Sequence, residues 1–139
     1  MNIGEAAKAS GVSAKMIRHY EMIGLISRAA RTEAGYREYG APEVHTLRFI
    51  RRARDLGFSL DAIADLLALW RDRSRSSADV KQMALAHVQD LEAKIAALQD
   101  MAATLQQLAD RCAGDSRPDC PILEDLQAHP SVRSKNLMD

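Results

Sequence analysis

The second half of the chain carries a long run in which apolar residues recur at alternating steps of four and three. This spacing places the apolar side chains along one narrow face of a helix, which is the pattern of a coiled-coil seam. The pattern extends from Ser77 to Arg111, and Cys112 takes the next seam position. A helix this long with a single apolar face needs a partner helix to bury that face. The earlier seam positions are Ala84, Val88, Leu91, Ile95, Leu98, Ala102, Leu105 and Ala109.

We expect the long helix to end near Cys112, because turn-forming residues follow it. Gly114 suits a helix C-cap, and Pro118 cannot continue a helix from within. The next apolar run begins at Cys120, where Pro121 suits the first position of a short helix. The two cysteines of the chain therefore bracket a short, turn-rich loop at a helix end.

Composition argues for a small domain with a helical arm rather than one large globular core, since aromatic residues make up only 4% of the 139 residues. No apolar run reaches membrane-spanning length, and the first residues lack the apolar core of a signal peptide. We therefore expect a cytoplasmic protein without membrane contact. In that compartment thiols stay reduced, so a structural disulfide is not expected.

The net charge of zero hides an uneven distribution of charged residues. Residues 1–57 hold ten Lys or Arg against six Asp or Glu, a net charge of +4. The remaining residues hold nine basic against thirteen acidic side chains, a net charge of −4. A basic head on an acidic arm predicts that a polyanion such as DNA binds the head.

The first residues predict two short helices joined by a turn. The first covers Ile3–Ala9, the turn lies at Ser10 and Gly11, and the second covers Ala14–Ile23. Ser13 is a good N-cap for the second helix. This arrangement is a helix-turn-helix, in which the second helix reads DNA.

The second helix carries a basic face at three- and four-residue spacing, formed by Lys15, Arg18 and His19. Tyr20 can pack inward or sideways, and we also count it as a candidate DNA contact. Taken alone, the pattern fits an ordinary solvated basic face about as well as it fits DNA binding.

Two short strands at residues 25–26 and 36–39 would form a hairpin wing beside this motif. The wing would carry Arg31 and Arg37 outward and present the ring of Tyr36 to a sugar-phosphate backbone. Such contacts position a protein on DNA without reading its sequence.

Two further helices follow the wing. The first starts near Pro42, ends near Leu56 and has a basic side that includes Arg54, another candidate backbone contact. Ser59 caps the second. Its expected buried stripe is Ile63, Leu66, Leu67 and Trp70.

The expected fold is mainly α, with a winged helix-turn-helix head and a long dimerisation helix. The expected segments are a DNA-binding domain at 1–70, a linker at 71–76, a dimerisation helix at 77–111, a metal-binding loop with a short helix at 112–127, and a flexible tail at 128–139.

These residues resemble the MerR family of bacterial transcription regulators over nearly the whole chain. The motifs that carry the resemblance lie at residues 3–7, 17–21, 24–26, 35–39 and 54–58. Within the family, residues 77–81 and the Cys112/Cys120 pair resemble the copper-efflux branch. The resemblance implies a homodimer with an antiparallel coiled coil and a metal loop at each end of that coil.

Two thiolates without a third cysteine form a small, soft ligand set. Zinc prefers four ligands, whereas monovalent copper tolerates few. The resemblance implies one Cu(I) per protomer on Cys112 and Cys120, with Ag(I) and Au(I) left open. The helix N-terminus near Ser77 of the second protomer and the ammonium group of its Lys81 would compensate the negative charge of the bound thiolates. Relatives that sense divalent ions carry cysteine at the position of Ser77.

The family likeness further implies a promoter-bound activator that distorts DNA when metal binds, so that RNA polymerase can use the promoter. Three alternatives remain: a thiol-disulfide redox protein using Cys112 and Cys120, a related regulator of a divalent metal, and a coiled-coil adaptor without DNA. Asp115 and Asp119 could ligate a harder cation, although their spacing in a turn-rich loop is more often ordinary solvated turn chemistry. The sequence contains no catalytic constellation, so we expect a protein that is not an enzyme.

Overall fold

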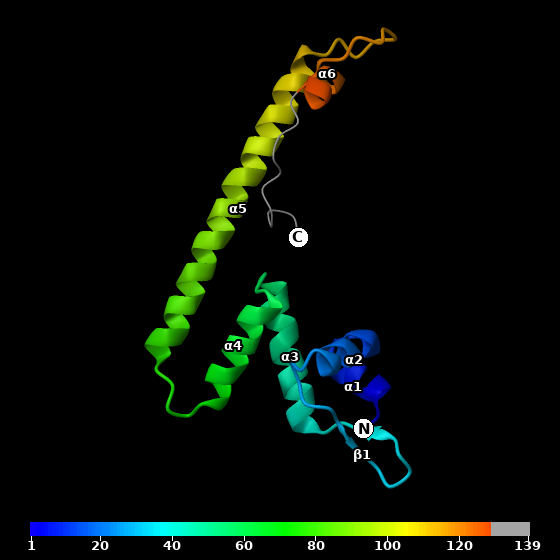
Figure 1. The fold of residues 1–139 in the computed structure, drawn as a ribbon, viewed down its shortest axis with the longest axis vertical. Coiled ribbons are helices and arrows are strands. Elements are labelled where there is room, and N and C mark those ends of the chain that lie inside the picture. The colour runs from blue at the N-terminus through cyan, green and yellow to red at the C-terminus, as the bar shows by residue number, and fades with distance from the viewer. Residues whose placement is uncertain (129–139) are drawn as a thin grey trace. The chain divides into compact units, whose positions relative to one another are not determined.

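The computed structural model describes residues 1–128, and the expected tail lies outside the described residues from residue 129 onward. The described chain is mainly helical, as predicted, with one small hairpin (Figure 1). It divides into two compact units, residues 1–80 and residues from 81 onward.

The first unit opens with the predicted pair of short helices. Helix α1 (Ile3–Ser10) begins at a capping box in which Asn2 and Glu5 exchange hydrogen bonds. Helix α2 (Ala14–Met22) has Ser13 as its N-cap, and the Ser13 side chain accepts a hydrogen bond from the backbone N–H of Met16. The helix-turn-helix prediction is therefore confirmed.

The wing is a two-stranded antiparallel hairpin formed by β1 (Ala30–Arg31) and β2 (Arg37–Glu38). The predicted first strand at Leu25 and Ile26 is wrong. The backbone N–H groups of both residues donate to the carbonyl of Tyr20, at 3.0 and 3.3 Å, so they extend the turn after α2 instead of pairing with β2.

Two longer helices complete the head. Helix α3 (Ala41–Asp55) has Pro42 in its first turn, and α4 (Leu60–Arg71) is capped by Ser59, as predicted. Trp70 differs from the expected buried stripe of α4, because 41% of it is exposed. Its ring stacks on Phe49 of α3 with a centroid separation of 4.7 Å, so one face packs while the other stays open in this chain.

The core of the head lies where α1, α2, α3 and α4 meet, with α1 contacting both α2 and α3. Apolar residues at helical spacing on each helix build this core, which also includes the ring of Tyr39 from the end of the wing. Burying these side chains is the main stabilising contribution to a domain of this size. The members with almost no exposure are Ala6, Ile17, Tyr39, Leu47, Ile50, Ile63 and Leu67.

Helix α5 (Ser77–Arg111) has the predicted bounds and is drawn as one uninterrupted helix in Figure 1. Both Ser76 and Ser77 have hydroxyl groups that could cap its N-terminus. The Ser76 hydroxyl accepts a hydrogen bond from the backbone N–H of Ala78 at 3.1 Å, which identifies Ser76 as the cap.

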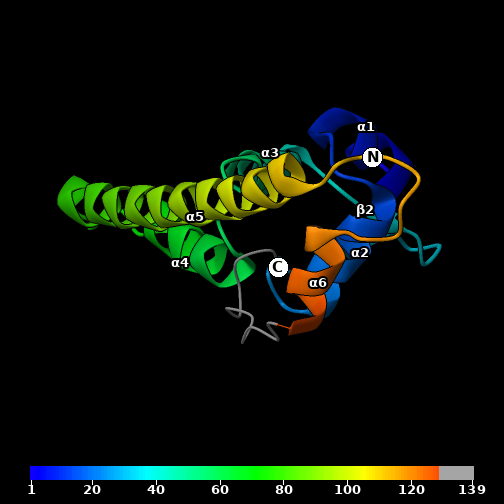
Figure 2. The ribbon, with the colours of Figure 1, turned by 90° about the horizontal axis from the view of Figure 1, so that it is seen from above.

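Beyond α5 the chain enters the loop that carries the cysteines. Gly114 adopts a left-handed backbone with φ 68°, but it lies inside this loop, because the helix has already ended at Arg111. Figure 2 shows the loop extending away from the end of α5 before the chain turns back into α6 (Pro121–Ala128). Pro121 is the first residue of α6, as predicted. In the part of the chain that is described, no helix is long and apolar enough to cross a bilayer.

Candidate functional site

The exposed face of α2 carries the three basic residues expected to meet DNA. Lys15, Arg18 and His19 are all exposed. Tyr20 is placed differently, because only 5% of it is exposed and it belongs to the core. A ring in that position is unavailable for a direct DNA contact, so we assign Tyr20 to packing. Basic and apolar residues occupy opposite faces of α2, so the basic side chains are exposed while the ring of Tyr20 is buried.

The tip of the wing presents two of the predicted backbone contacts. Tyr36 is 74% exposed, and the exposed Arg31 donates from Nη1 to the carbonyl of Gly35 at 2.9 Å. This bond braces the hairpin from within. The backbone N–H of Thr32 donates to the carbonyl of Tyr36 at 2.7 Å and closes the turn. The wing is thus a short, internally tied support for an exposed cation and an exposed ring.

Arg37 does not point simply outward, which corrects the expectation from sequence. Its Nη1 lies 3.3 Å from Oε1 of Glu21, and 32% of its side chain is exposed against 2% for the side chain of Glu21. Burial of the carboxylate explains the difference, since an unpaired buried charge is far more costly than a paired one. Arg37 therefore has one nitrogen committed to the protein, while part of its side chain still reaches the surface.

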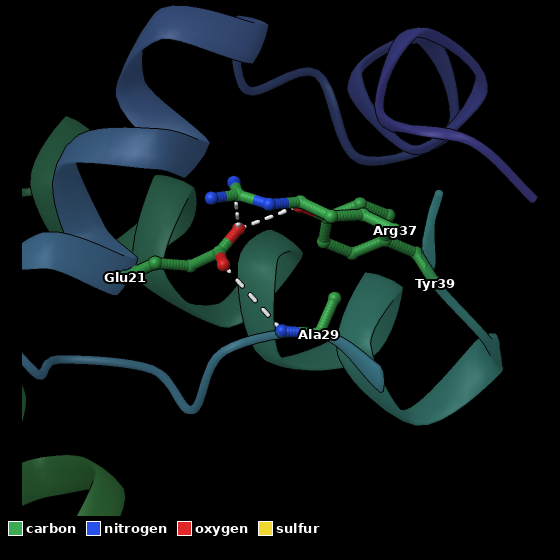
Figure 3. A network of polar contacts seen from close by, with 4 residues as sticks. All are labelled: Glu21, Ala29, Arg37 and Tyr39. Atoms are coloured by element: carbon green, nitrogen blue, oxygen red, sulfur yellow. Dashed lines mark hydrogen bonds and ion pairs between the residues drawn. The ribbon is translucent and has the colours of Figure 1, made fainter. Parts of the chain in front are cut away.

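Glu21 is the centre of a polar network that the sequence reading missed (Figure 3). Its Oε1 accepts hydrogen bonds from Arg37 Nη1 and from the Tyr39 hydroxyl, the latter at 2.5 Å. Its Oε2 accepts from the backbone N–H of Ala29 at 3.4 Å. Burial, followed by the hydrogen bond to Glu21, raises the pKa of Tyr39 above its usual value. The sequence did hold a signal for this network, because Glu21 is an acidic residue at a position of α2 where the helical spacing predicts a buried side chain.

The basic side of α3 divides into structural and surface roles. Arg48 Nε donates to the carbonyl of Ala9 at 3.0 Å, and Arg51 Nη1 donates to the carbonyl of Gly11 at 3.0 Å, so both hold the end of α1. Gly11 has φ 77°, and a Cβ there would lie 1.7 Å from the Arg51 guanidinium. The positive φ favours glycine here, and a Cβ would also force the end of the Arg51 side chain to move. Arg54, a predicted DNA contact, is exposed and donates to the carbonyl of Phe58 at 3.4 Å.

The second unit brings the two cysteine side chains together. Both are free thiols of intermediate exposure, and the Cys112 side chain hydrogen-bonds with that of Cys120. Cys120 immediately precedes α6, so its sulfur accepts from the first backbone N–H groups of that helix. The backbone N–H of Leu123 is the largest cause that lowers the pKa of the Cys120 thiol. The backbone N–H of Ile122 and the Cys112 side chain lower this pKa further, whereas desolvation raises it. These contacts make the thiolate form of Cys120 easier to reach than in an isolated cysteine.

Within residues 1–128, no third metal-binding side chain joins these two thiols. Among residues 1–128 there is no cluster of three or more His, Cys, Asp or Glu side chains that could hold a metal ion. The carboxylate of Asp115 is engaged with Arg117, 2.8 Å from its Nε and 2.9 Å from its backbone nitrogen, which supports the turn interpretation of this residue. Asp119 and Cys120 line a hollow of about 280 Å³ beside the loop. The donor set fits a soft ion that accepts two sulfur ligands.

The two residues predicted to surround the metal lie at the other end of α5. Ser77 and Lys81 are both exposed. From Lys81 to Arg111 the helix axis is about 45 Å long at the standard rise per residue. Neither side chain can span that distance to the sulfurs of its own chain. A role at the metal site therefore requires a second copy of the chain.

The predicted seam of α5 is exposed in the single chain. Ile95 is 54% exposed, and Leu98 and Leu105 are similarly open. Within the described part of the second unit, Leu108 is the one fully buried residue. A continuous exposed apolar stripe of this kind marks an interaction surface.

Comparison with known protein families gives two matches. Residues 1–70 match the family described as "MerR HTH family regulatory protein", and residues 44–108 match "MerR, DNA binding". The first match covers the helix-turn-helix, the wing and α4. The second runs from α3 to the last turns of α5.

Individual relatives agree with these matches. The chain is 68% identical to the HTH-type transcriptional regulator HmrR of Sinorhizobium medicae, over 91% of this chain and 86% of the relative. It is 43% identical to the regulator CueR of Escherichia coli, over 91% and 93% of the two chains. A crystal structure of the regulator PbrR691 from Ralstonia metallidurans, in complex with lead(II), is similar with a TM-score of 0.79 and 31% identity, over 91% of this chain and 98% of that one.

Proposed function

The chain belongs to the MerR family of helix-turn-helix regulators, and from this premise we propose that it is a dimeric transcription activator that responds to Cu(I). In this proposal it acts in the cytoplasm and controls genes for metal efflux or detoxification. Residues 1–70 bind promoter DNA, 77–111 form the dimer and 112–127 hold the metal. The observation that carries the metal assignment is the contact between two free thiols that no third ligand joins among the described residues.

The DNA-binding half of the proposal rests on the exposed basic face of α2 and the tip of the wing. Lys15, Arg18 and His19 would enter the major groove, as the second helix of a helix-turn-helix does. Arg31, Tyr36 and Arg54 would contact the backbone and set the register. Arg37 would reach a phosphate with the part of its guanidinium that Glu21 does not hold. The net charge of +4 on residues 1–57 supports a polyanionic partner.

The dimer would form through the exposed seam of α5 in an antiparallel coiled coil. If Cys112 of one protomer meets residues 77–81 of the other, the two-fold axis passes near residues 94–96, and Ile95 approaches its own copy. This arrangement brings the N-terminus of one α5 and its Lys81 to the thiolates of the second protomer. Two thiolates around a +1 ion leave a net charge of −1, which a helix N-terminus and an ammonium group would stabilise.

The names of the relatives support a metal signal and differ on which metal. One relative at 62% identity is named heavy metal-dependent transcription regulator 1 of Rhizobium meliloti, and CueR is a further relative. The lead(II) complex of PbrR691 favours a divalent ion as the second candidate. Serine rather than cysteine at position 77 leaves two thiols in the chain, which argues for a monovalent ion, with Ag(I) and Au(I) as alternatives to Cu(I).

Activation would work through the shape of the DNA. The dimer would spend binding energy on bending and untwisting the promoter, so that RNA polymerase can engage both promoter elements. Metal can shift the balance only if it binds one arrangement of the protomers more tightly than the other. Transcription should therefore respond to metal much more strongly than DNA affinity does.

The deciding experiment is an anaerobic titration of the reduced protein with Cu(I), Ag(I), Au(I) and Zn(II). We expect one monovalent ion per chain, lost in both Cys112→Ser and Cys120→Ser, and promoter output in a reconstituted transcription assay that rises with the ion. Tight Zn(II) binding with four ligands would replace the Cu(I) assignment by a divalent one. Turnover of a dithiol reductant without metal binding would point to a redox protein instead.

A further inference from the structure

The wing is poorly anchored by its own strands. Its ladder pairs only Ala30 with Glu38 and Arg31 with Arg37, and an isolated two-stranded hairpin is marginally stable in water. Contacts outside the ladder must therefore decide where the wing stands relative to α2. This placement matters for the proposed function, because α2 would enter the groove while the wing contacts the backbone.

Glu21 supplies such contacts from the last turns of α2. Its two oxygens bind the residue before β1, a residue within β2 and the residue after β2, through Ala29, Arg37 and Tyr39 respectively (Figure 3). One carboxylate thus ties both strands of the wing to the helix. Within the described residues, every buried side-chain nitrogen and oxygen has a hydrogen-bond partner, so the network is complete.

The position of Glu21 is unfavourable on two general grounds, which makes its network informative. A negative charge near the C-terminus of a helix opposes the helix dipole. A buried carboxylate also loses hydration, and only 6% of Glu21 is exposed. Three donors from the wing and its flanks compensate these costs. A neutral side chain would fill the space without these costs, so the charge itself calls for an explanation.

Arg37 gives that explanation. A guanidinium carries five N–H groups, and Nη1 is the nitrogen that contacts Glu21. About a third of the Arg37 side chain is exposed, on the strand that also leads from the wing tip. A carboxylate that accepts from one guanidinium nitrogen restricts the orientations of that group, and a guanidinium binds phosphate oxygens best when its orientation is set.

We infer that Glu21 is a positioning residue for DNA binding: it fixes the wing against α2 and orients Arg37 so that its remaining N–H groups meet a backbone phosphate. The inference rests on the proposed function and names the residue that prepares the contact. Glu21 itself does not touch DNA, because its side chain is buried.

The test compares Glu21→Gln with Glu38→Gln in the full-length protein. Each variant removes one negative charge, and Glu38 is an exposed residue of the wing. If charge alone mattered, both variants would bind DNA more tightly. Positioning predicts opposite signs: a loss of about tenfold for Glu21→Gln, equivalent to one charge-assisted hydrogen bond, and a slight gain for Glu38→Gln.

The probe is a duplex selected from random-sequence DNA by the wild-type protein, with affinity measured across a range of salt concentrations. For Glu21→Gln the slope of log affinity against log salt should shrink by about one for each wing that loses its phosphate contact. Hydroxyl-radical footprinting should lose protection at the wing phosphates and keep it where α2 binds. A loss of folding alone would weaken both protections together.

A double-mutant cycle with Arg37→Gln closes the test. Once Arg37 is replaced, Glu21→Gln should change the affinity little further, since the two residues act as one unit. Additive losses, or equal effects of Glu21→Gln and Glu38→Gln, would overturn the inference. If Glu21→Gln fails to fold, Arg37→Gln alone must reproduce the lost wing protection and the smaller salt slope. Absence of salt-dependent duplex binding by the wild type would instead reject the proposed function.

Discussion

The two units of the molecule bury their apolar residues in opposite ways. The head, residues 1–80, encloses a core that draws on four helices and the end of the wing. In residues 81–128 the apolar residues of α5 lie mostly open, and Leu108 is the buried one. Both patterns have helical spacing, so periodicity does not separate them. The head therefore buries its apolar surface within one chain, whereas the apolar surface of the arm stays exposed unless a partner covers it.

The largest effect should come from a charge in the middle of the seam. In Ile95→Asp, two carboxylates would meet at the proposed two-fold axis, and each buried unpaired charge costs several kcal/mol. We expect the dimer dissociation constant to rise by about a thousandfold or more, measured by analytical ultracentrifugation. Ala93→Asp, two residues away on an exposed position off the seam, is the matched control and should leave the dimer intact. A dimer that tolerates Ile95→Asp would place the interface elsewhere.

Next in size is a cavity in the core of the head. Leu47 is fully buried, so Leu47→Ala should lower the free energy of unfolding of the head by about 2–5 kcal/mol. The loss should not depend on protein concentration, in contrast to the effect of Ile95→Asp. Urea unfolding followed by circular dichroism measures it. Met22→Ala, at a residue that is 75% exposed, should stay within about 0.5 kcal/mol of the wild type.

A smaller effect should appear where the linker meets α5. Ser76→Ala removes the hydroxyl that accepts a hydrogen bond from the backbone N–H of Ala78. This loss of the N-cap should destabilise the start of α5 by about 1 kcal/mol. Ser77→Ala, one residue on, keeps that cap and should change stability by a few tenths of a kcal/mol at most. Hydrogen exchange of the first amides of α5 distinguishes the two. Equal effects would mean that Ser76 is not the cap.

The smallest effect concerns alkaline pH. Because burial and Glu21 raise the pKa of Tyr39, the folded head holds the hydroxyl proton more tightly than the unfolded chain, whose tyrosine titrates near pH 10. The protonated Tyr39 hydroxyl therefore makes its full contribution to the free energy of unfolding below about pH 10. This contribution is lost as pH rises through the folded-state pKa of Tyr39. Unfolding free energies measured across this range should fall more steeply for the wild type than for Tyr39→Phe. Tyr36→Phe, at an exposed ring, should retain the wild-type slope.

Much of the fold could be predicted because the deciding signals are local. Ser13 and Ser59 cap the helices where a serine before an apolar-periodic run should do so, and α5 has the predicted bounds. The first strand of the wing could not be found in this way. Leu25 and Ile26 have strand-forming composition, but their N–H groups are taken by the carbonyl of Tyr20 at the end of α2.

The candidate sites show the same division between local and distant information. The basic face of α2 and the cysteine pair follow from spacing along the chain. The roles of residues with distant partners could not be found from local spacing. Arg48 and Arg51 donate to carbonyl groups at the end of α1, and Arg37 contacts Glu21. The sequence shows that a residue is basic, but the residue that it contacts in the fold determines whether its side chain faces solvent.

By itself, the sequence determined the helices, the serine caps of α2 and α4, the apolar stripe of α5 and the two thiols, because each depends on residues within a turn or two of one another. Only the tertiary structure decided that Tyr20 is buried, that Trp70 is half open and that Glu21 joins the wing to α2. These outcomes depend on residues 16 to 18 positions apart, or on different helices. Their meeting is set by how the elements pack, which no local pattern specifies.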